Sequence, residues 1–360
     1  METEDGQSLL LRRLNTLLSR VGDFWLRRSY LQQIALVIVL LLAKNAFDIE
    51  LRNIQEAYLP GAQEFPQAVG YYSASFGQVI MAYGLGVTTT TQWVVLHAVL
   101  IAIALGVAFY LISKAGPERR SFIILVLASA TATSSLFVSI GKYDFITYLG
   151  AVLLALARTL PGAAVGALIM VSGNPEQAVV ASLALVFLSL APAFSDLRLR
   201  GLVAGAIAGT AWFGVQTWFR FSEMETGRAE LLLEYLGQSL SQVIVSPGTS
   251  LWSWLNAGWL LVVFMTLSAP RSSMKWIIAG LVVIPGLATI VTADGARVFG
   301  LIVLPAYVIA ALRFARAFRP DSRPYRILIG SSLIALVVLP TIVEGQGWLV
   351  GQVMGLHIWP

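Results

Sequence analysis

The sequence predicts an all-α protein, a polytopic bundle of about eleven transmembrane helices. Hydrophobic residues make up 57% of the 360-residue chain, charged residues make up only 12%, and the mean hydropathy is +0.78. A soluble domain could not bury so much apolar surface. The apolar stretches run for roughly 17 to 22 residues, the length that a helix needs to cross a hydrocarbon core of about 30 Å. Helices also satisfy their own backbone hydrogen bonds there.

The predicted membrane helices follow one another along the whole chain. Their ranges are 29–47, 90–113, 122–140, 145–159, 161–173, 177–194, 201–219, 251–268, 276–292, 299–317 and 325–343. The short pair 145–159 and 161–173 is separated by Arg158 and Pro161, so a tilted hairpin that enters the membrane without crossing it is an alternative. Neither reading changes the orientation of the later helices. Because no soluble domain or low-complexity linker interrupts the pattern, residues 1–360 are predicted to form one domain.

The first 28 residues place five arginines around leucines and aromatic residues. This pattern predicts an amphipathic helix lying on an anionic leaflet. A disordered basic tail is the alternative. A cleavable signal is not indicated, because no short apolar region with a small-residue cleavage site follows the arginines.

Lysine and arginine beside the spans indicate the orientation of the chain. With the N-terminus in the cytoplasm, most of the 24 basic residues fall on the cytoplasmic side, as basic residues do in membrane proteins. Residues 48–89 and 220–250 then form two long outer loops, and the second has leucines at helical spacing that predict an amphipathic helix. Since most acidic residues also fall outside, the outer face is the expected active face.

Three predicted outer helix ends each carry a cation beside an acid. The three groups are Lys44 with Asp48 and Glu50, Lys142 with Asp144, and Arg297 with Asp294. Charges close to hydrocarbon are costly and face a cavity or one another. In the structural reading, each group neutralises itself at its own helix end. In the functional reading, the groups converge on one outward cavity, where the cations bind phosphate and an acid serves as a general base.

Arg297 is the better phosphate clamp of the three cations, because a guanidinium can hold two oxygens at once, whereas Lys142 and Lys44 act as point charges. The chain has no cysteine, and its two histidines, His97 and His357, are far apart in sequence. A histidine or cysteine metal site is therefore not predicted. No nucleotide-binding motif is present. The sequence thus indicates no cofactor and no nucleic acid partner. It does not decide whether the protein binds a divalent cation.

Two segments, GKYDFITYLGAVLLALA and DGARVFGLIVLPA, carry a resemblance. Together with the number of helices, the long first outer loop and an acid just after the first helix, they resemble the multi-spanning C-type glycosyltransferases that use polyprenyl-phosphate sugars. They also resemble uncharacterised membrane proteins of bacterial surface-polysaccharide pathways. In that superfamily an acid of the first outer loop is the usual base, a role that falls on Asp48 here. The Ile49 and Glu50 that follow Asp48 depart from the family's pattern.

The resemblance implies a glycosyltransferase of the bacterial inner membrane that moves a sugar from a polyprenyl-phosphate-linked donor to a glycan or lipid acceptor on the outer face. Asp48 would take the acceptor proton, while Arg297 and Lys142 would stabilise the departing phosphate. Asp144 and Asp294 would orient those cations, with Lys44 and Glu50 as further substrate contacts.

Two other functions stay open: a transporter or flippase of a lipid-linked saccharide, and a surface-polysaccharide polymerase or ligase. Transporters commonly show internal repeats and binding sites at the membrane midplane. This sequence shows no convincing repeat, and its charges lie at helix ends, which favours an enzyme. The expected partners are the lipid-linked donor and membrane lipids, and the sequence does not give the oligomeric state.

Overall fold

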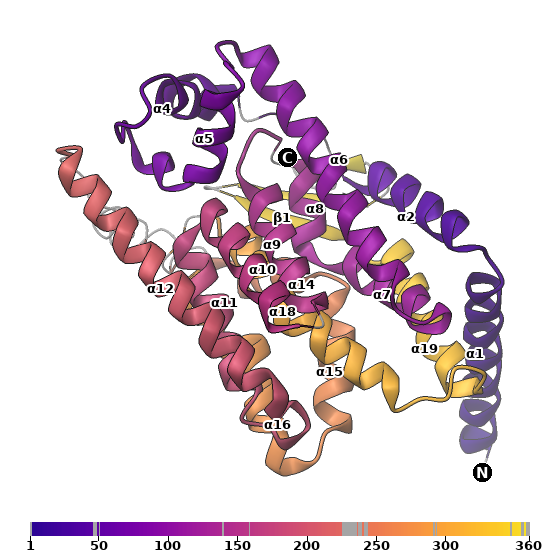
Figure 1. Ribbon diagram of the computed structural model, residues 1–360. Coiled ribbons are helices and arrows are strands. Elements are labelled where there is room, and N and C mark those ends of the chain that lie inside the picture. The colour runs from indigo at the N-terminus through magenta and orange to yellow at the C-terminus, as the bar shows by residue number, and fades with distance from the viewer. Residues whose placement is uncertain are drawn as a thin grey trace.

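The computed structural model of the chain describes residues 2–45, 49, 51–138, 140–157, 159–224, 236, 240, 244–290, 292, 294–345, 348–353 and 356–357. These residues form a helical bundle with one small sheet near the C-terminus (Figure 1). The all-α class predicted from composition and span length is therefore confirmed, and the sheet is the exception to it.

The helices of the first half are α1 (Glu2–Leu26), α2 (Tyr30–Lys44), α3 (Leu51–Asn53), η1 (Ile54–Tyr58), α4 (Leu59–Gln63), η2 (Tyr71–Ala74), α5 (Phe76–Gly84), α6 (Thr90–Ser113), α7 (Pro117–Ser129), α8 (Thr131–Val138), α9 (Asp144–Leu156) and α10 (Leu160–Gly173). Those of the second half are α11 (Pro175–Leu188), η3 (Pro192–Leu197), α12 (Arg198–Phe221), α14 (Pro247–Leu255), α15 (Gly258–Ser268), α16 (Arg271–Ile278), η4 (Ala279–Val283), α17 (Ile284–Thr289), α18 (Gly295–Arg316) and α19 (Arg323–Val338). The strands are β1 (Thr341–Gly345), β2 (Trp348–Val353) and β3 (Leu356–His357).

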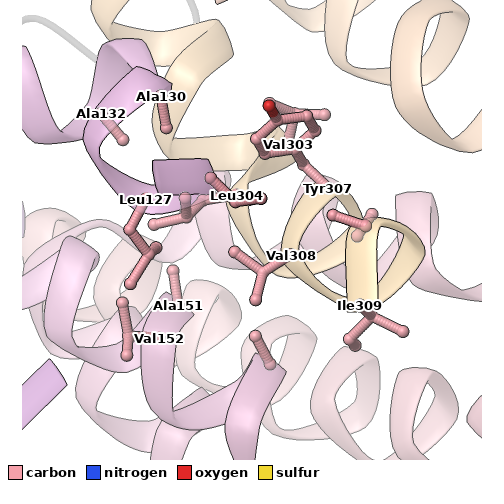
Figure 2. Packing of buried hydrophobic residues seen from close by; sticks show 14 of the residues in the cluster. Leu127, Ala130, Ala132, Ala151, Val152, Val303, Leu304, Tyr307, Val308 and Ile309 are labelled. Atoms are coloured by element: carbon pink, nitrogen blue, oxygen red, sulfur yellow. The ribbon is translucent and has the colours of Figure 1, made fainter. Parts of the chain in front are cut away.

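Helix α18 is the centre of the bundle. It packs against α7, α8, α9, α11 and α14. Of its most apolar 18-residue stretch, 83% is buried inside the protein. A helix that is apolar all round requires such a position. Figure 2 shows Val303, Leu304 and Val308 of α18 among side chains of α7, α8 and α9. Small residues permit this close approach, since a Cβ added at Gly300 would lie 2.8 Å from the Ala132 backbone nitrogen.

Four described helices are long and apolar enough to cross a membrane, and up to seven spans result if each bent helix pair counts as one. The four are Thr90–Ser113, Pro192–Phe221, Arg271–Thr289 and Gly295–Arg316. Two predicted spans, 122–140 and 251–268, are bent: α7 meets α8 at 54° and α14 meets α15 at 85°. Helices α9, α10 and α11 are shorter apolar helices. The protein is thus membrane-embedded.

The N-terminal helix α1 forms as predicted, and the structure adds a partner for it. Helix α1 lies along α19 at one side of the bundle (Figure 1). Two glycines make the contact: a Cβ at Gly22 would lie 2.0 Å from the Arg326 carbonyl oxygen, and one at Gly330 would lie 2.0 Å from that of Leu18. Several leucines of α1 stay exposed, among them Leu10 and Leu14.

The C-terminal sheet was not predicted from the sequence, which indicated a membrane helix over 325–343. Helix α19 ends at Val338 because Pro340 disfavours helical geometry at the residue before it. The strands then pair antiparallel in the order β1-β2-β3, with Thr341 opposite Gln352. Asn256, between α14 and α15, holds β1 in place: its Oδ1 accepts from the Ile342 N–H at 2.8 Å.

The two predicted outer loops differ in what the structure describes of them. Within 48–89, the helices from α3 to α5 gather at one end of the bundle, near the start of α6 (Figure 1). Within 220–250, residues 225–235, 237–239 and 241–243 lie outside the described residues, and with them most of the predicted amphipathic helix.

The contact between α1 and α19 provides a test of the packing. We expect Gly330→Ala to destabilise the protein by about 1–3 kcal/mol, because the added methyl group collides with backbone of α1. Gly106→Ala in α6 is the matched control, since nothing lies within 4 Å of its added Cβ. Thermal unfolding in detergent measures both variants. Equal melting temperatures for Gly330→Ala and the parent would contradict the close packing.

Candidate functional site

The turn over residues 140–143 presents three functional side chains at the start of α9. Gly141 has a φ of +107°, a conformation that favours glycine. The Trp93 indole donates a hydrogen bond to the Gly141 carbonyl oxygen at 3.0 Å, and Ile54 covers the turn on another side. Ile140 also pairs with Ile49. These contacts fix Lys142, Tyr143 and Asp144, which follow Gly141 directly.

Asp294 and Arg297 meet this turn from the start of α18. One guanidinium nitrogen of Arg297, Nη1, donates to Asp144 Oδ1 at 2.7 Å, and the other, Nη2, donates to Asp294 Oδ2 at 2.6 Å. Lys142 Nζ lies 3.4 Å from the same Asp294 oxygen. The structure therefore joins two of the three predicted charge groups into one network, called the charge cluster below.

The charge cluster is buried and electrically balanced. Arg297 is 6% exposed and Asp144 is 1% exposed. Two cations face two carboxylates, which is the condition under which ionised groups persist away from water. The edge of the cluster at Lys142 and Asp294 is the more accessible one, with side chains 10% and 16% exposed. A ligand would therefore reach Lys142 and Asp294 first.

Four helices begin around the charge cluster. Asp144 is the first residue of α9, and Asp294 immediately precedes α18. Trp93 in the first turn of α6 binds Gly141, and Asn174 before α11 donates to the Tyr143 hydroxyl at 3.3 Å. Because the N-terminus of a helix carries a partial positive charge, this end of the bundle suits carboxylates and other anions.

Three buried polar atoms beside the charge cluster have no hydrogen-bond partner within the described part of the chain. They are Asp144 Oδ2, Arg297 Nε and the Tyr58 hydroxyl. Burial raises the pKa of Tyr58 well above its ordinary value, and the charges of Arg297 and Asp144 also act on it. The phenol therefore stays protonated. One acceptor and two donors of this kind are suited to binding a hydroxyl group.

Asp294 is ionised at all physiological pH values. Burial raises its pKa, but the positive charges of Arg297 and Lys142 outweigh burial and bring the pKa to about 2. Such a carboxylate does not exchange protons near neutral pH. Its place in the cluster is that of a positioning residue for Arg297 and Lys142.

The hydrogen bonds of Lys44 go to residues outside the charge cluster. Its ammonium donates to the Leu336 carbonyl oxygen, and to that of Leu339 at 2.9 Å, at the end of α19. A cation there satisfies carbonyl groups that the helix leaves unpaired. The predicted role of Lys44 as a substrate contact stays a prediction. Asp48 and Glu50, also predicted at this site, lie outside the described residues.

Sequence reasoning missed the aromatic part of the site. The Tyr58 and Trp93 rings stack with centroids 5.7 Å apart, and the Arg297 guanidinium lies 5.6 Å from the Tyr143 ring centre. Tyr143, inside the GKYD segment, was the available signal. Tyr58 and Trp93 offered no signal, because aromatic residues at helix ends are common in membrane proteins.

No group of three or more histidine, aspartate or glutamate side chains in the described ranges could hold a metal ion. No family model, curated protein or solved structure matches the chain.

Removing Arg297 should be costly. We expect Arg297→Ala to lower the free energy of unfolding by about 3–5 kcal/mol, because two carboxylates lose their partner inside the protein. The control is Arg52→Ala, which removes a pair with Glu56 whose side chains are 85% and 63% exposed, and which should cost about 1 kcal/mol or less. Denaturant unfolding in micelles measures both. A double variant, Asp144→Asn with Arg297→Gln, restores the charge balance and should recover part of the loss.

The low pKa of Asp294 makes stability depend on pH. Its carboxylate stabilises the fold above the unfolded pKa of about 4, and that contribution disappears as the pH falls through the folded pKa of about 2. We expect the melting temperature of the parent to fall more steeply than that of Asp294→Asn over this window. If the melting temperatures of the parent and Asp294→Asn fell in parallel with pH, Asp294 would have the same pKa in the folded and unfolded states.

Proposed function

We propose that the protein is a glycosyltransferase of the bacterial inner membrane that uses a polyprenyl-phosphate-linked sugar donor. The N-terminus lies in the cytoplasm in this proposal, and the charge cluster faces the outer side. The observation that carries the proposal is the buried carboxylate of Asp144, which has one oxygen held by Arg297 and the other unpartnered, at an end of the bundle where four helices begin.

Asp144 has the surroundings of a general base. Arg297 fixes Oδ1 at 2.7 Å and so sets the direction of Oδ2, the atom that would take the proton of the acceptor hydroxyl. The hydroxyl oxygen then bonds to the anomeric carbon of the donor sugar. The bond from that carbon to the phosphate oxygen breaks, and the lipid phosphate leaves with the electron pair. Asp48, the base that the family resemblance implies, is the second candidate for the same step.

The donor phosphate fits the accessible edge of the charge cluster. Both terminal nitrogens of Arg297 already hold carboxylates, so the phosphate competes with Asp294 for Lys142 and Arg297. Arg297 therefore differs from the phosphate clamp expected from the sequence, in which both terminal nitrogens of the guanidinium are free to hold phosphate oxygens. The helix N-termini favour the incoming anion. The cations, held in place beforehand, would stabilise the charge that develops on the leaving phosphate.

A transporter of a lipid-linked saccharide is the second candidate, and a specific feature favours it. The charge cluster is closed and neutral, so a ligand that passes through must open the Arg297 pairs, as in a gate. A polymerase or ligase of surface polysaccharide would use the same cluster with a glycan acceptor. The enzyme is preferred because Asp144 Oδ2 is a poised acceptor, a feature that a gate does not require.

The enzyme proposal is tested in proteoliposomes that contain bacterial polyprenyl-phosphate-linked sugars and an acceptor lipid fraction. We expect mass spectrometry to detect a new glycosidic product, and Asp144→Asn to reduce its formation by about 10²–10⁴-fold, since an amide cannot accept the proton. Glu56→Gln, at an exposed acid of η1, should leave the rate unchanged.

Asp48→Asn, tested alongside, shows which acid is the base. Loss of product in Asp48→Asn with retention in Asp144→Asn would move the base to Asp48. Movement of the lipid-linked saccharide across the bilayer without any new glycosidic bond would support the transporter instead.

A further inference from the structure

We propose that the bend between α1 and α2 binds one anionic phospholipid, with its phosphate among the arginines at the end of α1 and in the turn that follows it, and an acyl chain along α2. The two helices meet at 114°. An open pocket of about 450 Å³ lies at the bend, lined by Arg20, Asp23, Phe24, Arg27 and Arg28. This site is separate from the charge cluster and does not depend on the proposed reaction.

The pocket is strongly basic. Its three arginines are exposed, and the carboxylate of Asp23, the acid in its lining, faces Arg326 at 3.2 Å. Arg326 therefore offsets the negative charge of Asp23. Guanidinium groups bind phosphate oxygens in pairs of parallel hydrogen bonds. The pocket thus has the charge and the donors that a phosphate headgroup needs.

An apolar groove continues from the pocket. The groove has a volume of about 390 Å³ and is lined by Phe24, Arg28, Gln32, Ala35, Leu36 and Val39. Phe24 and Arg28 line both hollows, and the Arg28 guanidinium lies 4.3 Å from the centre of the Phe24 ring. The two hollows therefore form one site with a cationic end and an apolar end.

The order of residues along α2 matches the order of groups in a phospholipid. Gln32, Leu36 and Val39 of α2 recur at spacings of three or four residues and so share one face of the helix, and Arg28, which precedes α2, lines the same groove at its start. Polarity decreases along this face from guanidinium to amide to hydrocarbon, as it does from headgroup to acyl chain. An acidic peptide would satisfy the arginines but would leave the apolar side chains of Leu36 and Val39, 44% and 63% exposed, uncovered.

Lipid binding is measured with the purified full chain in detergent by titration with phosphatidylglycerol and, separately, with phosphatidylcholine, following bound lipid by native mass spectrometry. We expect phosphatidylglycerol to bind the parent more tightly. Arg27→Gln with Arg28→Gln should weaken that binding about tenfold or more, because charge-assisted hydrogen bonds to phosphate are lost. The matched control, Arg12→Gln with Arg13→Gln, removes two adjacent exposed arginines of α1 that lie outside the pocket and should bind as the parent does.

Leu36→Gln tests the apolar end without altering any arginine, and it should weaken phosphatidylglycerol binding while leaving the preference over phosphatidylcholine in place. Equal weakening by the two arginine pairs would show diffuse attraction to basic residues and would overturn the proposal. Binding of glycerol phosphate as tight as that of phosphatidylglycerol would identify a free-anion site instead. Tighter binding of an acidic peptide than of phosphatidylglycerol would also contradict a lipid site.

Discussion

The pairing of Arg297 with Asp144 and Asp294 is the constraint on which the arrangement of the bundle depends. Arg297 is the charged residue among the buried positions of α18, a helix that is otherwise apolar through its buried length. An unpaired cation there would cost several kcal/mol. The loop before α9 and the loop before α18 must therefore meet, and the two helices are aligned at their N-terminal ends by a contact between polar groups.

The two oxygens of the Asp144 carboxylate have different roles, one structural and one chemical. Oδ1 of Asp144 holds Arg297, whereas Oδ2 has no partner within the described residues. Around it, Trp93 fixes the Gly141 turn and Tyr58 stacks on Trp93, so that the short helices between α2 and α6 cover the charge cluster. Burial of this kind strengthens the electrostatic interactions on which both the fold and the proposed reaction rely.

Away from the charge cluster, close backbone contacts at glycines hold pairs of helices together. Gly150 and Gly166 bring α9 and α10 together, since a Cβ at either would lie within 2.5 Å of backbone on the other helix. Gly22 and Gly330 do the same for α1 and α19. In a membrane, helices gain little from burying apolar surface against one another, so close van der Waals contact through small residues holds them. The site proposed at the α1–α2 bend would add lipid to this set of contacts.

Local features of the sequence determined the membrane class, the helical content, the amphipathic α1 and the proximity of Asp294 to Arg297, because composition, periodicity and a spacing of three residues act within one element. Only the tertiary structure decided that Asp144 joins that pair, that Lys44 donates to carbonyl groups at the end of α19, and that residues 341–345, 348–353 and 356–357 form strands. Each of these outcomes depends on which distant segments become neighbours. Buried charges and unpaired backbone groups need partners, and the sequence alone does not state which partner lies within reach.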